Sequence, residues 1–261
     1  GLKRTEDGIF RNGVRAWTSQ AVHAGDVIET HLVETEPSDG ILPRPVPFSV
    51  VYEDDDILVV DKPADTPIHP SIGNYENTLA NGIAWYFEQK GEPFVYRCIN
   101  RLDRDTTGLI VLAKHALSAA VLSQAMRSRE IHRTYQAFAL GETAESGTID
   151  APIARLDGSL IQRTVDFASG ERSVTHYRTL AHCSGFSHLE LSLETGRTHQ
   201  IRVHMAYIGH PLLGDTLYNK TPGTFPRQAL HSASLSFIHP ITGEPLNFHA
   251  PLPEDMQNLL T

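Results

Sequence analysis

Residues 99–114 read INRLDRDTTGLIVLAK and place a charged cluster directly before an apolar run. The run LIVLA is short and bounded by polar residues, which is typical of a strand buried on both faces. Asp103 precedes it, between Arg101 and Arg104 and ahead of a Thr-Thr-Gly turn. Since alternate side chains of an extended segment share a face, we expect Arg101, Asp103 and Asp105 to point the same way.

Asp103 has two interpretations on this pattern. A carboxylate beside arginine stays ionised, which suits a nucleophile better than a general acid. In the plainer interpretation Asp103 caps the turn or pairs with a neighbouring arginine, and the local pattern slightly favours this structural role. The choice between the two depends on the other segments of the chain.

Strands are predicted along most of the chain by apolar runs and by alternation. Beyond 109–114, they are expected within 9–34 and at 57–61, 134–140 and 187–193. The segment 35–48 holds four prolines in fourteen residues and predicts a linker, with a domain boundary near 45. We therefore expect an N-terminal β segment with linker over 1–45 and a larger domain over 46–261.

Three helices are predicted between the strands. The first covers 78–90, and the second covers 115–127 with Leu117, Ala120, Val121 and Met126 among its apolar face. The third follows Thr198 as N-cap and ends at Gly209. Because strands and helices do not alternate regularly, the pattern favours the α+β class over a doubly wound sheet.

Length and composition exclude several classes of protein. The 261 residues suffice for a hydrophobic core, and no apolar run approaches the eighteen residues of a membrane span. The N-terminal stretch lacks the apolar segment of a secretory signal, and Cys98 and Cys183 are too few for a disulfide framework. We expect a soluble, cytoplasmic protein and take a monomer as the default.

The net charge of −9 is unevenly distributed. Between 29 and 65 there are ten acidic and two basic residues, whereas 97–133 holds seven basic and three acidic ones. The local field follows local charge, so the acidic total does not exclude an RNA partner.

A second polar cluster, ETGRTHQIRVHMAYIGHPLLGD, covers 194–215. On the predicted helix, His199 and Arg202 lie opposite Ile201 and Met205, so Arg202 faces the side where a substrate or an ionised Asp would lie. Arg197 precedes the helix, where backbone N–H groups favour an anion such as phosphate. The alternative is a solvated basic face.

Metal and nucleotide motifs are missing from the sequence. His199 and His204 are five residues apart, whereas a helical zinc pair needs a spacing of four. His239 and the other loop histidines have no Cys or carboxylate ligand set near them in sequence, and no phosphate-binding glycine loop is present. We expect no metal site, and we expect Cys98 to be an inert, buried thiol.

The segment Arg133-Thr134-Tyr135 lies on the strand predicted at 134–140. A tyrosine on the solvent-facing side of a sheet can stack on a base or exchange protons. A half-buried aromatic residue with a packing role is an equally good interpretation of Tyr135 by itself.

Five segments in order resemble the RluA-type pseudouridine synthase family, over about 46–261. They are DKPADTPIHP, NRLDRDTTGLIVLAK, RTYQAFALG, LETGRTHQIRVHMAYIGHPLLGD and ALHSASLSFIHP. Four positions depart from the family pattern: Asp61, Asp65, Asn100 and Arg133 stand for the usual asparagine, glycine, histidine and lysine. The N-terminal RNGVRAW…VHAGDVI resembles the end of an S4-type RNA-binding module.

The resemblance implies a mixed, largely antiparallel sheet with flanking helices and a central RNA-binding cleft. It implies a catalytic Asp103 nucleophile, with Tyr135 against the target base and Arg202 paired with Asp103. It further implies that Arg101 props the RNA open and that Leu230 closes the apolar side of the pocket. Arg197 and His199 complete the expected RNA contacts.

The implied reaction isomerises uridine to pseudouridine in structured RNA, with ribosomal RNA favoured and transfer RNA a second possibility. No cofactor is implied, because no net redox change occurs. Two other functions stay open. The first is a non-catalytic RNA-binding or remodelling protein that kept the fold. The second is a glycosidic hydrolase, which needs a second carboxylate, and Asp105 is the only one close in sequence.

Overall fold

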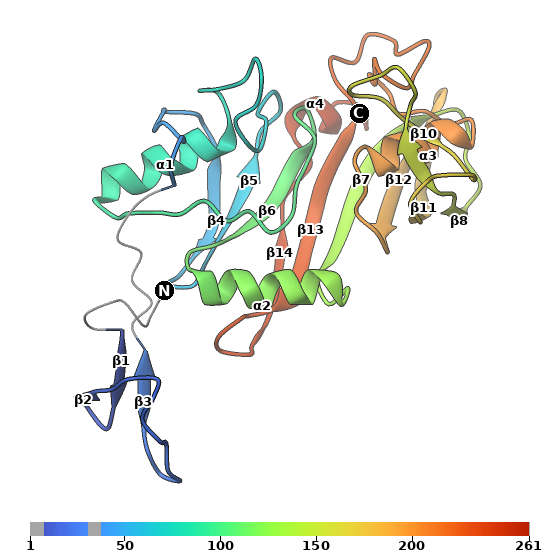
Figure 1. The fold of residues 1–261 in the computed structure, drawn as a ribbon. Helices are drawn as coiled ribbons and strands as arrows, with labels where there is room; N and C mark the ends of the chain where they lie inside the picture. The colour runs from blue at the N-terminus through green and yellow to red at the C-terminus, as the bar shows by residue number, and fades with distance from the viewer. Residues whose placement is uncertain (1–7, 31–37, 261) are drawn as a thin grey trace.

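The computed structural model describes residues 8–30 and 38–260, and within them a nine-stranded sheet is the main element (Figure 1). The strand order is β4-β5-β6-β13-β7-β12-β11-β8, and β14 pairs with β13. The parallel pair β6–β13 is the exception among otherwise antiparallel neighbours in this described sheet. The strands are β4 (Ser49–Glu53), β5 (Ile57–Lys62), β6 (Thr107–Ala113), β7 (His132–Leu140), β8 (Ser146–Asp150), β11 (Val174–Cys183), β12 (Phe186–Leu193), β13 (Leu230–Ile238) and β14 (Pro245–His249).

Helices and smaller sheets complete the described part of the chain. The helices are α1 (Leu79–Lys90), α2 (Ala116–Arg127), α3 (Gln200–Tyr207) and α4 (Glu254–Gln257). The smaller sheets are formed by β1 (Ile9–Arg11), β2 (Val14–Arg15) and β3 (Ile28–Thr30), and by β9 (Ile153–Arg155) and β10 (Arg163–Val165). None of the helices in 8–30 and 38–260 has the length and apolar character that crossing a membrane requires. The α+β prediction and the mixed, largely antiparallel sheet are confirmed.

The central strands β5 and β6 are buried on both faces. In β5, Leu58 and Val60 belong to the hydrophobic cluster that contains α1, whereas Ile57 and Val59 belong to the cluster that contains Leu122 of α2. The two helices therefore cover opposite faces of the sheet, since alternate residues of a strand point to opposite sides. This explains why both strands appear in the sequence as uninterrupted apolar runs.

The first two predicted helices form where expected, but the second buries another face. Thr78 accepts a hydrogen bond from the Asn81 amide and begins α1. In α2, Leu117 and Val121 are exposed, and Leu122 is fully buried instead. The predicted apolar face of α2 was thus wrong at Leu117, Ala120 and Val121, whereas Met126 packs against the core as expected.

The phase of α2 is set by its N-cap. The His115 ring accepts from the Ser118 amide, and its Nε2 lies 2.7 Å from Oδ1 of Asp56 in the loop before β5. This contact fixes the start of the helix against the sheet, so Ser118 and Leu122 face the core.

The N-terminal strands lie within the predicted range 9–34, of which 31–34 fall outside the described residues. The described part of the proline-rich segment, 38–48, contains no helix or strand.

Gly108 is the residue through which β6 approaches β13. It has φ +111°, and it faces the backbone of Ser232, its parallel partner. We expect Gly108→Ala to lower the free energy of unfolding by about 2–5 kcal/mol, since the new methyl group adds a collision to backbone strain. Gly243→Ala is the matched control, because Gly243 has φ +76° but open space around it. Urea denaturation measures both changes, and equal losses would contradict the collision.

Candidate active site

Asp103 lies on a loop that is fastened from two sides. The Lys62 Nζ donates to the carbonyls of Pro63 and Arg104, at 2.7 and 2.8 Å. On the other side, the Arg227 guanidinium donates to the Asp105 carbonyl. The loop is therefore anchored through its backbone, which leaves the Asp103 side chain free to bind other groups.

Two departures from the family pattern have structural explanations here. Asn100 is buried and exchanges hydrogen bonds with β6, donating to the Leu109 carbonyl and accepting from the Val111 amide. Asp65 replaces the usual glycine and adopts φ +52°, a left-handed conformation that Asp tolerates better than most residues. Both residues shape the segments on either side of the Asp103 loop.

Arg202 joins two carboxylates from different parts of the chain. Its Nη1 donates to Asp103 Oδ2 at 2.9 Å, while Nε and Nη2 donate to the two oxygens of Asp215 at 2.7 and 2.9 Å. The Asp215 side chain is fully buried, whereas that of Asp103 is 22% exposed. Burial opposes the charge of Arg202, but the two carboxylates more than offset it and raise its pKa above the ordinary value. Arg202 therefore stays protonated between the two carboxylates.

Helix α3 begins one residue later than the sequence predicts. Its N-cap is His199, at φ +57° and without a capping side-chain bond, so the prediction of Thr198 as N-cap was wrong. The Gln200 side chain instead stabilises the turn before the helix, since its Oε1 accepts from the Arg197 amide and the Thr195 hydroxyl. This turn places Arg202 inside the protein, so the solvated basic face does not exist at that residue.

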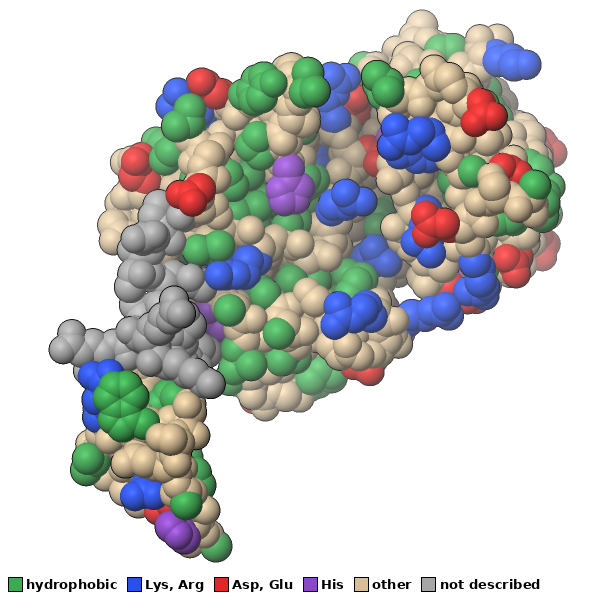
Figure 2. All heavy atoms as spheres, in the orientation of Figure 1, with side chains coloured by type: hydrophobic (Ala, Val, Ile, Leu, Met, Phe, Trp, Pro, Cys, Tyr) green, Lys and Arg blue, Asp and Glu red, His purple; other side chains and the backbone are tan. Residues whose placement is uncertain are grey.

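Seven side chains expected from the sequence to act together line one cavity of about 60 Å³. They are Arg101, Asp103, Tyr135, Arg197, His199, Arg202 and Leu230. A cleft of about 520 Å³ shares Arg101, Asp103, Tyr135 and Arg197 with this cavity. Lys and Arg side chains gather across the middle of the face shown in Figure 2. The arrangement combines a small apolar and charged pocket with a wider opening suited to a polyanion.

Tyr135 and Arg197 differ in their surroundings from the expectation. Tyr135 is only 4% exposed, so it does not lie on a solvent-facing side of the sheet, although its side chain lines the cavity. Arg197 forms an ion pair of 2.6 Å with Glu171, and its side chain remains 41% exposed. An anion that binds Arg197 has to compete with this surface carboxylate.

His199 is part of a hydrogen-bonded pair that the sequence did not reveal. Its Nδ1 lies 2.8 Å from the Tyr218 hydroxyl, which accepts from the Arg163 amide, and its Nε2 lies 3.9 Å from Asp103 Oδ1. Burial lowers the pKa of His199, so neutral imidazole is favoured near Asp103. The Tyr218 ring also lies 5.1 Å below the Arg202 guanidinium. Tyr218 has no signal in the sequence that points to this site.

Lys62 is a second residue that the sequence analysis missed, although a lysine so close to the apolar run 57–60 was a usable signal. It is fully buried, and burial lowers its pKa to about 7. Between pH 7 and 10 the unfolded chain therefore binds a proton that the folded protein does not, so this group makes stability rise with pH.

We expect Lys62→Met to remove that contribution, which amounts to as much as about 1.4 kcal/mol per pH unit. The free energy of unfolding, measured with urea at pH 7, 8 and 9, should rise less steeply than in the wild type. Lys220→Met, at an exposed lysine, is the control and should leave the slope unchanged. An unchanged slope in Lys62→Met would show that Lys62 titrates normally.

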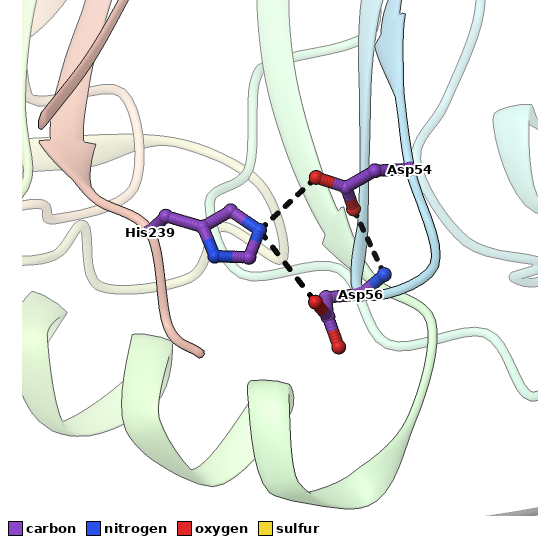
Figure 3. A group of neighbouring side chains, drawn as sticks. All are labelled: Asp54, Asp56 and His239. Atoms are coloured by element: carbon purple, nitrogen blue, oxygen red, sulfur yellow. Dashed lines mark hydrogen bonds and ion pairs between the residues drawn. The ribbon is translucent and has the colours of Figure 1, made fainter. Parts of the chain in front are cut away.

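The sequence predicted no carboxylate near His239, but the fold brings Asp54 and Asp56 to it (Figure 3). The Thr242 amide donates to His239 Nδ1 at 3.0 Å, so the ring proton lies on Nε2, which donates to Asp54 Oδ2 at 3.0 Å. Asp54 Oδ1 accepts from the amides of Asp56 and Ile57. Both ring nitrogens of His239 therefore form hydrogen bonds, and the cluster links the end of β13 to the β4–β5 turn.

Comparisons with known proteins agree with this geometry. A family model described as RNA pseudouridylate synthase matches residues 56–207. A Bacillus subtilis protein described as an uncharacterized RNA pseudouridine synthase, YjbO, is 42% identical over 250 residues, which are 95% of this chain and 88% of that protein. The ribosomal large subunit pseudouridine synthase D of Vibrio cholerae is 42% identical over 251 residues, covering 90% of this chain and 76% of that protein.

A solved structure shares the architecture. The human RNA pseudouridylate synthase domain containing 1 superposes with a TM-score of 0.65 at 26% identity, over 83% of this chain and 86% of that one.

Proposed function

The chain belongs to the RNA pseudouridylate synthase family and is an isomerase, and from this premise we propose that it modifies ribosomal RNA with Asp103 as the nucleophile. The observation that carries the proposal is the Asp103–Arg202–Asp215 chain of ion pairs at a cavity beside an arginine-lined cleft. Ribosomal RNA is favoured over transfer RNA because several relatives at 40–42% identity are named ribosomal large subunit pseudouridine synthase D.

The reaction breaks the N1–C1′ bond of uridine and joins C1′ to C5 of the same base. C5 loses one proton and N1 gains one, so the reaction needs no electron donor or acceptor. Asp103 supplies an anionic oxygen at the reacting centre, and Arg202 holds that oxygen in place. Tyr135 lies against the base and assists the proton transfer from C5.

The remaining cavity residues position the RNA in this proposal. Arg101 fills the space that the uridine leaves in the stack of RNA bases. This offsets part of the free energy of unstacking the uridine, which is about a few kcal/mol. Leu230, which is 4% exposed, closes the apolar side of the pocket. Arg197 binds a phosphate in place of Glu171, and His199 contacts the uridine.

Hydrolysis of a glycosidic bond has weaker support. It needs a second carboxylate within reach of the reacting carbon. Asp105 pairs with Arg104 at 3.3 Å and does not line the cavity, and Asp215 is buried behind Arg202. Release of free uracil during turnover would favour hydrolysis over isomerisation.

We assign the catalytic unit to 46–261, and the segment 1–45 to a separate β segment with linker. In support, β1, β2 and β3 pair with one another and not with the strands of the large sheet.

Pseudouridine mapping of total RNA tests the proposed function. Cells that carry the gene are compared with cells that lack it and with the complemented strain. A uridine of large-subunit ribosomal RNA should lose its modification on deletion and regain it on complementation. A lost signal in transfer RNA would correct the substrate, and an unchanged RNA profile would contradict the proposal.

A further inference from the structure

Arg133 is a cleft residue whose guanidinium has an unused donor within 8–30 and 38–260. Arg133 and Tyr135 are two positions apart on β7, so they share a face, and both line the cleft beside Asp103. The Nε of Arg133 is buried without a hydrogen-bond partner, and the guanidinium forms no ion pair with any described residue. A buried donor without an acceptor costs about 1–3 kcal/mol, so such groups call for an explanation.

The end of the Arg133 side chain lies against a glycine of the cleft wall. A Cβ placed on Gly196 would be 3.5 and 3.6 Å from Nη1 and Nη2 of Arg133. Since Gly196 carries no side chain, the space beside both terminal nitrogens stays open toward the cleft that the two residues line.

The carboxylates of the cleft do not neutralise Arg133. Asp103 is bound by Arg202 at 2.9 Å, and Glu194 is bound by Arg172 at 2.9 Å and by Arg129 at 3.2 Å. The positive charge of Arg133 is therefore available to an anion that enters from outside.

We propose that Arg133 binds the RNA phosphate directly beside the target uridine, an inference that rests on the proposed function. A guanidinium presents parallel N–H groups that match two oxygens of a phosphodiester. Two residues of a strand span about 6.5 Å, so an anion on Arg133 lies within one nucleotide of a base on Tyr135. The phosphate thereby fixes the backbone on one side of the extruded nucleotide.

Binding measurements with single neutral linkages test this contact. The probe is a ribosomal RNA fragment centred on the uridine that loses its modification in the deletion strain, and affinities are measured in an Asp103→Asn background to prevent turnover. Single methylphosphonates replace the phosphates around the uridine, each compared with a phosphodiester of the same sugar chemistry. Arg133→Ala, Arg133→Lys and the charge-matched control Arg178→Ala, at an exposed residue, complete the set.

We expect Arg133→Ala to weaken binding about ten- to a hundredfold and to reduce the salt slope by about one unit. A methylphosphonate at one position should weaken RNA binding by the protein that carries Arg133. The same substitution should cause no further loss of affinity in Arg133→Ala. Arg133→Lys should recover part of the affinity, because lysine keeps the positive charge but lacks the parallel N–H donors of the guanidinium.

The phosphate contact would be overturned if the effects of Arg133→Ala and of the methylphosphonate were additive at every phosphate. It would also be overturned if Arg133→Ala were coupled to a base substitution instead. Equal effects of Arg133→Ala and Arg178→Ala would overturn it as well. The RNA probe for all these measurements is chosen by the mapping experiment alone, as a ribosomal RNA fragment centred on the uridine that loses its modification on deletion, and its turnover by the purified wild type is followed in parallel. Normal pseudouridine formation without coupling counts against the Arg133 contact alone, whereas no pseudouridine formation in this fragment counts against the proposed function.

Discussion

The Asp103→Asn enzyme is expected to fold and bind RNA normally but to form pseudouridine at least about four orders of magnitude more slowly than the wild type. The change keeps the shape of the side chain and removes the anionic oxygen at the cavity. Arg202 stays paired with Asp215, so no buried charge loses its last partner. We therefore expect the free energy of unfolding to change by about 1 kcal/mol or less.

The measurement is single-turnover pseudouridine formation in the ribosomal RNA fragment identified by mapping. Asp105→Asn is the matched control, since Asp105 lies on the same loop but pairs with exposed Arg104. It should retain most of the activity. Turnover by Asp103→Asn within about tenfold of the wild type would exclude Asp103 as the nucleophile.

Asp215→Asn should be among the most destabilising single changes in the site, by about 3–5 kcal/mol. Asp215 is fully buried and binds Arg202 through both oxygens. Without its charge, the buried guanidinium keeps only Asp103 as a carboxylate partner. We also expect slower turnover, because Arg202 is no longer held from behind and Asp103 loses its fixed position.

Asp255→Asn provides the comparison for Asp215→Asn. Asp255 binds Arg227 with the same two-oxygen geometry, at 2.8 and 2.9 Å, but its side chain is 33% exposed. Arg227 is itself buried but keeps three backbone carbonyls as acceptors, so the loss should be smaller than for Asp215→Asn, at about 1–3 kcal/mol. Urea unfolding of both variants gives the difference, and equal losses would show that burial of the carboxylate is not what makes Asp215 important.

The predictable part of the fold is the part that local pattern controls. The apolar runs of β5 and β6 are visible because both faces of these strands are buried. The 3.6-residue period also placed Arg202 on the side of α3 that meets Asp103.

The features that the sequence did not reveal depend on contacts between distant segments. The phase of α2 follows from His115 and Asp56, which are 59 residues apart. The histidine–carboxylate cluster joins Asp54 to His239, which are 185 residues apart. Periodicity cannot report such pairs, because it records only which residues of one segment share a face.

The position of β13 sets the order in which this protein can assemble. It lies in the middle of the sheet, between β6 and β7, although its residues 230–238 come late in the chain (Figure 1). During synthesis, β6 and β7 each expose an unpaired edge until β13 emerges, which is a state open to misassociation. Leu230 and Arg202 likewise reach Asp103 only when more than 90 further residues have been made. A nascent chain therefore carries its proposed nucleophile long before it has a cavity in which to use it.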